Sequence, residues 1–172
     1  REQEIKNMAA TFDFLRKEVL PQQRRSMITI NANEKSKTDE EISKLAASSP
    51  DSLTVEELLY AATLTNDINE KLKIYQSSQK IYADDWRGHN NAGYILLLQN
   101  KVNEAEEALN KAAKASPNNV IVNNNMGIVA RWKGDRSKAK ELYAAASGAG
   151  SEVSYNMAII NIMEGDYGSA TS

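Results

Sequence analysis

The stretch WRGHNNAGYILLLQNKVNEAEEALNKAAKASPNN, residues 86–119, is followed at once by VIVNNNMGIVARWKGDRSKAKELYAAASGAGSEV, residues 120–153. The two stretches match when they are written one above the other. The matching pairs are Gly93 and Gly127, Ala105 and Ala139, Leu109 and Tyr143, and Ala112 and Ala146. All four pairs have the same spacing. A period of about 34 residues predicts antiparallel helix pairs that bury their apolar faces on one another and are not stable singly.

The same pattern extends in both directions. One period earlier, Tyr60 falls on Tyr94 and Asn69-Glu70 falls on Asn103-Glu104. Later in the chain, Asn156-Met157-Ala158 matches Asn125-Met126-Gly127 at a shorter spacing, so three residues have been lost, and we place the loss within 147–150. The array is therefore predicted to contain more than two helix pairs.

Small residues, turns and caps place the helices. Gly93 and Gly127 stand where two helices approach closely, and Pro117 stands just past a helix end. Thr54-Val55-Glu56-Glu57 forms a capping box that begins the first helix of the array. The helices are predicted at 54–65, 69–83, 86–99, 103–115, 120–132, 136–147, 151–163 and from 167 onward.

These residues resemble the tetratricopeptide repeat. Residues 86–117 carry the small residue, the following large residue, the alanines and the closing proline of that family. They are Gly93, Leu96, Ala105, Leu109, Ala112 and Pro117. The resemblance covers residues 52–172 and implies an all-α solenoid of helical hairpins that winds as a right-handed superhelix. Its units are 52–85, 86–119, 120–150 and 151–172, of which the first is degenerate and the fourth is cut off after Ala170.

Residues 1–50 do not follow the repeat. They are predicted to form a helix at 4–17, an extended segment at 24–31 and a helix opened by the capping box Thr38–Glu41. We interpret them as part of, or a linker to, a neighbouring domain. The run Leu20–Arg25, between a helix and a strand and ahead of the repeats, is similar to OmpA-like envelope proteins of Bacteroidetes. That resemblance implies a periplasmic or outer-membrane-associated location; a cytoplasmic location is the alternative.

Composition argues against several classes of function. The chain has no cysteine, one histidine and a net charge of −2, with about +1 in the first 50 residues and −3 in the rest. We therefore expect no nucleic-acid surface, no metal site, no cofactor and no catalytic residues. His89 stands where the family often has tryptophan and is interpreted as a packing residue. No apolar run approaches the roughly 20 residues of a membrane helix, so no direct membrane insertion is expected.

The first helices of the pairs are predicted to line a concave groove that binds a protein or peptide. The predicted groove residues are Tyr60, Arg87, Asn90, Asn91, Tyr94, Leu97, Asn124, Ile128, Arg131, Tyr155 and Ile159. Tyr94 and Ile128 stand where the family's carboxylate clamp has asparagine, so that activity is not implied. The leading hypothesis is a non-catalytic interaction scaffold. The alternatives are a structural module of an envelope protein whose groove packs on its own neighbouring domain, and an enzyme or carbohydrate-binding accessory.

Overall fold

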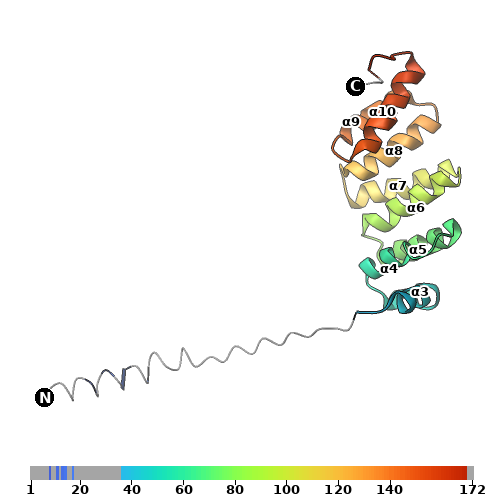
Figure 1. Ribbon diagram of the computed structural model, residues 1–172. Coiled ribbons are helices and arrows are strands. Elements are labelled where there is room, and N and C mark those ends of the chain that lie inside the picture. The colour runs from blue at the N-terminus through green and yellow to red at the C-terminus, as the bar shows by residue number, and fades with distance from the viewer. Residues whose placement is uncertain (1–7, 9–10, 12, 15–16, 18–35, 170–172) are drawn as a thin grey trace. The chain divides into compact units, whose positions relative to one another are not determined.

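The computed structural model describes residues 8, 11, 13, 14, 17 and 36–169, and the chain divides into two compact units, Arg1–Ser36 and Lys37–Ser172. The second unit is a succession of helices (Figure 1), and residues 36–169 contain no strand. Its elements are α3 (Asp39–Ser48), the 3-10 turn η2 (Pro50–Ser52), α4 (Val55–Ala61), α5 (Ile68–Ile81), α6 (Trp86–Leu98), α7 (Val102–Ala115), α8 (Val120–Trp132), α9 (Arg136–Ala145) and α10 (Ser151–Glu164).

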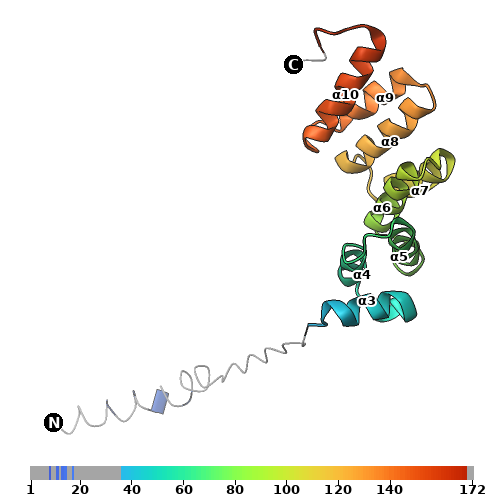
Figure 2. The same cartoon turned by 45° about the vertical axis from the view of Figure 1, so that its right-hand side comes forward.

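The helices pair in sequence. α4 packs on α5, α6 on α7 and α8 on α9, and each pair also packs on the next (Figure 2). This is the hairpin solenoid that the sequence repeat predicts. The predicted bounds of the helices from α5 to α10 agree with the structure to within two residues.

The second helix of each hairpin begins at one repeating position. Asp67, Lys101 and Asp135 are the N-cap residues of α5, α7 and α9, and they are one repeat apart. The Asp67 carboxylate accepts hydrogen bonds from two backbone N–H groups of its helix, and that of Asp135 accepts one, from Lys138. Asn100 precedes the cap Lys101 and has a φ of 61°, and Gly134 precedes the cap Asp135 and has a φ of 86°. Asparagine and glycine tolerate this left-handed turn better than other residues do.

Glycine permits the close contact inside the two middle hairpins. A Cβ atom added to Gly93 would lie 2.7 Å from Cγ of Leu109, and one added to Gly127 would lie 2.6 Å from Cδ1 of Tyr143. Cβ atoms do not come so close to other heavy atoms, so only glycine fits unless the neighbour moves. The interpretation of these two glycines as contact residues is confirmed.

The core forms three clusters along the array. One joins α3, α4 and α5 around Leu58, the second joins α5 to α8 around Leu109, and the third joins α9 and α10 around Tyr143. Because Ile42 and Ala46 of α3 belong to the first cluster, α3 is part of the core of the helical array. The compact unit starts at Lys37 and includes α3 together with residues 52–172, for which the repeat array was predicted.

Two predicted helices differ from the structure. α4 was predicted to reach residue 65 but ends at Ala61. There the Thr63 hydroxyl donates to the Tyr60 carbonyl at 2.7 Å, and the backbone N–H of Thr63 donates to the same oxygen, so the turn tightens. The helix predicted from 167 onward is wrong for residues 167–169, which are not helical.

The capping box Thr38–Glu41 is confirmed, since the Thr38 hydroxyl accepts from Glu41 N and the Glu41 carboxylate accepts from Thr38 N. In the predicted helix 4–17, the described residues Met8, Thr11, Asp13 and Phe14 are helical. The predicted strand at 24–31 and the run Leu20–Arg25 lie outside the described residues. The envelope resemblance therefore stays a prediction from the sequence.

Candidate partner-binding groove

A pocket of about 400 Å³ opens on α6 and α8, the first helices of two successive hairpins, and on the start of α10. We call it the groove pocket. Its lining residues come from α6, α8, the α9–α10 loop and the start of α10. They are Asn90, Asn91, Tyr94, Ile121, Asn124, Asn125, Ala149, Glu152 and Val153. The structure thus brings together four of the predicted groove residues: Asn90, Asn91, Tyr94 and Asn124.

The groove pocket lies on a surface formed by α6, α8 and α10, which we call the wall. Asparagine side chains join one unit to the next along it. Nδ2 of Asn125 on α8 donates to Oδ1 of Asn90 on α6 at 3.0 Å. Nδ2 of Asn156 on α10 donates to Oδ1 of Asn124 on α8 at the same distance. Both bonds join the same pair of repeat positions, and we call them the asparagine ladder. Asn90, Asn125 and Asn156 are buried, so the ladder satisfies amide groups that would otherwise lie in the interior without partners.

Two amide side chains that line the groove pocket have N–H groups without an acceptor among residues 36–169. Asn91 accepts from Asn90 at 3.2 Å through Oδ1, and Asn124 accepts from Asn156. The Nδ2 atoms of Asn91 and Asn124 donate no hydrogen bond to residues 36–169. Both side chains are half-buried and line the groove pocket. They therefore present fixed N–H donors to the pocket.

Apolar and acidic groups complete the pocket. Tyr94 is 46% exposed and Ile121 is 45% exposed, although both are large and apolar. Together they form an exposed, largely apolar part of the lining. Glu152, at the start of α10, is exposed and contributes the one carboxylate of the lining.

Arg87 lies in an ion-pair cluster and not in the groove pocket. Its guanidinium contacts the Asp85 carboxylate at 2.6 Å and that of Glu56 on the preceding unit at 3.1 Å. The hydrogen bonds from Arg87 lower the pKa of the Asp85 carboxyl, and those same bonds, first with Asp85 and then with Glu56, raise the pKa of Arg87. Arg87 thus joins α4 to α6 at the edge of the wall.

The prediction was wrong for Leu97, which is 3% exposed and belongs to the core around Leu109. Position 97 is one helical turn after Gly93, so its side chain points with that glycine toward α7. Arg131 stands at the same position one repeat later, one turn after Gly127. Its Nε atom is buried, and its guanidinium lies by the Tyr143 hydroxyl, whose pKa is nevertheless raised by burial.

The remaining predicted residues lie elsewhere on the first helices. Tyr60 is exposed and donates to Asp39 at 3.1 Å. Ile128 and Ile159 are half-buried, and Ile128 packs on two of the core clusters. Tyr155 is 69% exposed and lines a different pocket, beside α9. Asn90 lines the groove pocket but is 4% exposed, and its Oδ1 accepts a hydrogen bond from Asn125.

Sequence reasoning missed Ile121, Asn125, Ala149, Glu152 and Val153. Asn125 could have been predicted as a lining residue, because it is one repeat after the predicted groove residue Asn91. Ile121 is one repeat after Arg87, but a change from arginine to isoleucine hides the equivalence. The other three, Ala149, Glu152 and Val153, lie in the α9–α10 loop and the first turn of α10, at or just after the junction 147–150 where the repeat is shortened.

His89 is a packing residue, as interpreted. It is 6% exposed, and its Nε2 lies 2.9 Å from the Ala83 carbonyl. Among the described residues, no three His, Cys, Asp or Glu side chains gather as a metal site would require. In the same part of the chain, no helix has the length and apolar character needed to span a bilayer.

Comparisons with known proteins identify the fold. Neither a family model nor a curated protein matches the sequence. Solved structures do match. MamA has 15% sequence identity and a TM-score of 0.62 over 77% of this chain and 80% of its own. PilF of Pseudomonas aeruginosa has 18% identity and a TM-score of 0.59 over 77% of this chain and 63% of its own. Both are tetratricopeptide repeat proteins, and this chain has the tetratricopeptide repeat fold.

Proposed function

We propose that this chain is a non-catalytic scaffold that binds an extended segment of a partner protein in the groove pocket. The observation that carries the proposal is the pairing of fixed amide donors with exposed apolar side chains on one wall. Asn91 and Asn124 offer Nδ2 donors there, beside the exposed Tyr94 and Ile121. Backbone carbonyls of an extended peptide are suitable acceptors for these donors, since an extended strand leaves its own polar groups free.

Charge and size restrict the partner further. The lining contains Glu152 and no basic residue, which favours a segment that is neutral or carries a lysine or arginine. A volume of about 400 Å³ holds a few side chains and no folded domain. The partner is therefore a short extended stretch of protein.

The experiment uses peptides as the probe. A displayed library of short random peptides is selected on the wild-type protein, and the recovered peptides are titrated by calorimetry. The groove variant is Tyr94→Ala with Ile121→Ala, because both side chains are exposed and their loss leaves the core intact. We expect its affinity to fall by about tenfold or more, as for central anchors of an interface.

The matched control is Glu107→Ala with Lys111→Ala, two exposed residues on α7. This variant should bind the selected peptides as the wild type does. Circular dichroism should give equal helix content for all three proteins. Equal affinity in the groove variant and the wild type would reject the groove pocket as the recognition surface.

A further inference from the structure

The helices α6, α8 and α10 each carry an exposed, large apolar side chain at their end. Leu98, the last residue of α6, is 56% exposed, Trp132, the last of α8, is 42% exposed, and Met163, near the end of α10, is 43% exposed. Trp132 is one repeat after Leu98, and Met163 is one shortened repeat after Trp132. A single exposed apolar side chain is ordinary, but three at one repeat position form a surface. We call these three residues the ridge.

The backbone holds the three ridge residues in the same way. In each unit the N–H three residues after the ridge residue donates to the carbonyl two residues before it, and the distance is 2.9 Å in all three. Each ridge residue is also one helical turn after a predicted groove residue: Tyr94, Ile128 or Ile159. Residues one turn apart share a side of a helix and lie about 6 Å apart along its axis. The ridge therefore continues the wall beyond the groove pocket.

The interval between ridge residues restricts the conformation of a bound segment. α6 contacts α8 directly, and α8 contacts α10. Helices in such contact lie about 8–10 Å apart, so equivalent side chains recur at about this interval. A β-strand presents one face at intervals of about 7 Å, which is too short. A left-handed polyproline helix presents one face at every third residue, about 9 Å apart, and an α-helix at every seventh residue, about 10.5 Å apart.

The amides of the groove pocket favour the polyproline helix. The Nδ2 atoms of Asn91 and Asn124 need acceptors, and they lie within about one helical turn of Tyr94. A polyproline helix has no internal hydrogen bonds, so its carbonyls are free to accept from these donors, whereas the carbonyls of an α-helix are already bonded. Proline-rich segments also pack on surfaces with exposed aromatic rings, which Tyr94 and Trp132 provide here.

We propose that the segment bound at the groove pocket is a left-handed polyproline helix that crosses α6, α8 and α10 and packs every third side chain on the ridge. This inference rests on the proposed function of the groove pocket and names the class of its partner. That partner is a proline-rich stretch with an apolar residue at every third position. Its ridge contacts are with Leu98, Trp132 and Met163, and its carbonyls accept from Asn91 and Asn124.

The test uses the fluorescence of Trp132. The chain has two tryptophans, so Trp86→Phe leaves Trp132 as the single reporter. This protein is titrated with a blocked peptide of repeated Leu-Pro-Pro units, and we expect the emission of Trp132 to shift to shorter wavelength with a saturable curve. The matched peptide has the same leucines and prolines, but its leucines are alternately two and four residues apart. We expect its affinity to be lower by about tenfold or more, because its leucines no longer share one face.

Variants of the same protein locate the contact. Leu98→Ala with Met163→Ala, the ridge variant, should bind the Leu-Pro-Pro peptide about tenfold or more weakly. The matched control is Ile81→Ala, which removes an apolar side chain that is 36% exposed at the end of the second helix α5, and it should bind as its parent does. Circular dichroism and thermal unfolding show that each variant is folded.

Four outcomes would overturn the inference: no binding of the Leu-Pro-Pro peptide, equal affinity for both proline-rich peptides, unchanged affinity in the ridge variant, or tighter binding of a helical peptide with leucine at every seventh residue. If the library-selected peptides still lose affinity in Tyr94→Ala with Ile121→Ala, the proposed function stands and only the polyproline partner is rejected. If that groove variant binds both the selected peptides and the Leu-Pro-Pro peptide normally, the proposed function and the inference that rests on it both fail.

Discussion

The two middle hairpins and the first hairpin reach the same arrangement by different contacts. In α6–α7 and α8–α9 a glycine lets a large side chain of the second helix press against the backbone of the first. The first hairpin has Leu59 at the glycine position, and its first helix is short, Val55–Ala61. There, α3 adds Ile42 and Ala46 to the core, and the Tyr82 hydroxyl donates to the Leu53 carbonyl. A unit that departs from the repeat is thus stabilised by a neighbouring helix.

Removal of α3 should test this difference between the hairpins with the largest loss of stability. A chain that starts at Leu53 loses Ile42 and Ala46 from the core, so we expect its free energy of unfolding to fall by about 3–5 kcal/mol. A chain that starts at Lys37 keeps both residues and should unfold like the full chain. Urea unfolding followed by circular dichroism measures both. Equal stability of the two shortened chains would mean that α3 does not support the first hairpin.

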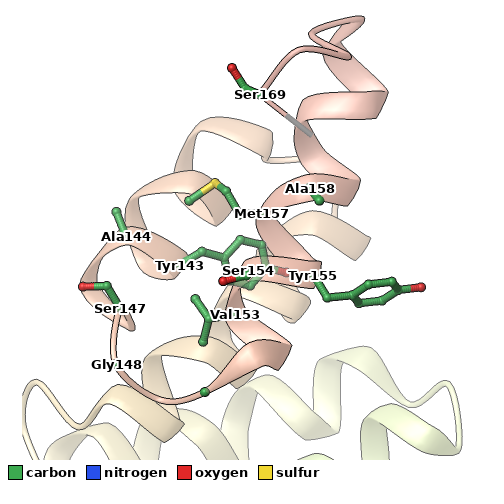
Figure 3. A pocket seen from close by; sticks show the side chains of 11 residues that line it. Tyr143, Ala144, Ser147, Gly148, Val153, Ser154, Tyr155, Met157, Ala158 and Ser169 are labelled. Carbon is green, nitrogen blue, oxygen red and sulfur yellow. The ribbon is translucent and has the colours of Figure 1, made fainter. Parts of the chain in front are cut away.

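Gly127→Leu tests the closed contact of a middle hairpin. The added side chain meets the Tyr143 ring, and we expect a loss of about 2–4 kcal/mol. The control is Ala158→Leu, which alters the equivalent position of α10 beside an open pocket between α9 and α10 (Figure 3), and it should cost less than about 1 kcal/mol. Thermal unfolding compares the two. A larger loss for Ala158→Leu would contradict the assigned register of α10.

Asn125→Ala tests the asparagine ladder between the middle hairpins. Loss of its Nδ2 leaves the buried Asn90 oxygen without that donor, which should cost about 1–3 kcal/mol. Asn123→Ala on the same helix is the matched control, because the Asn123 side chain is half-buried and makes no hydrogen bond with other residues of 36–169. Chemical denaturation should separate the variants. Equal losses would argue that the ladder adds nothing beyond the volume of an amide.

Asp85→Asn should have the smallest effect, and it should depend on pH. The pKa of Asp85 is lowered in the folded protein, so its ionised form stabilises the fold above the unfolded pKa of about 4. That contribution is lost as pH falls through the folded pKa. Between pH 5 and pH 2, the stability of the wild type should therefore fall more steeply than that of Asp85→Asn. Parallel stability curves for the two proteins would show that the Arg87 contact with Asp85 does not stabilise the fold.

Helix positions were predictable from the sequence because caps and turns recur from one repeat to the next. Asp67, Lys101 and Asp135 mark the second helices, and the structure places their N-caps there. The end of α4 was not predictable from periodicity, since the Thr63 hydroxyl competes for a backbone carbonyl. Local side-chain bonds of this kind leave the spacing of apolar residues unchanged.

The groove was predictable in part. The sequence placed Asn91, Tyr94 and Asn124 on the wall, but it also placed Leu97 and Arg131 there. Those two stand one turn after a glycine, on the side of the helix that faces its hairpin partner. The contribution of the α9–α10 loop depends on how a shortened junction folds back, and no repeat position predicts that.

The asparagine ladder also bears on how such an array changes its length. In each bond the later unit donates and the earlier unit accepts, and Asn124 and Asn125 give one unit both functions. A duplicated copy of residues 120–150 would therefore find a suitable acceptor before it and a suitable donor after it. Gene duplication can then lengthen the solenoid by a whole unit without any new buried amide losing its partner.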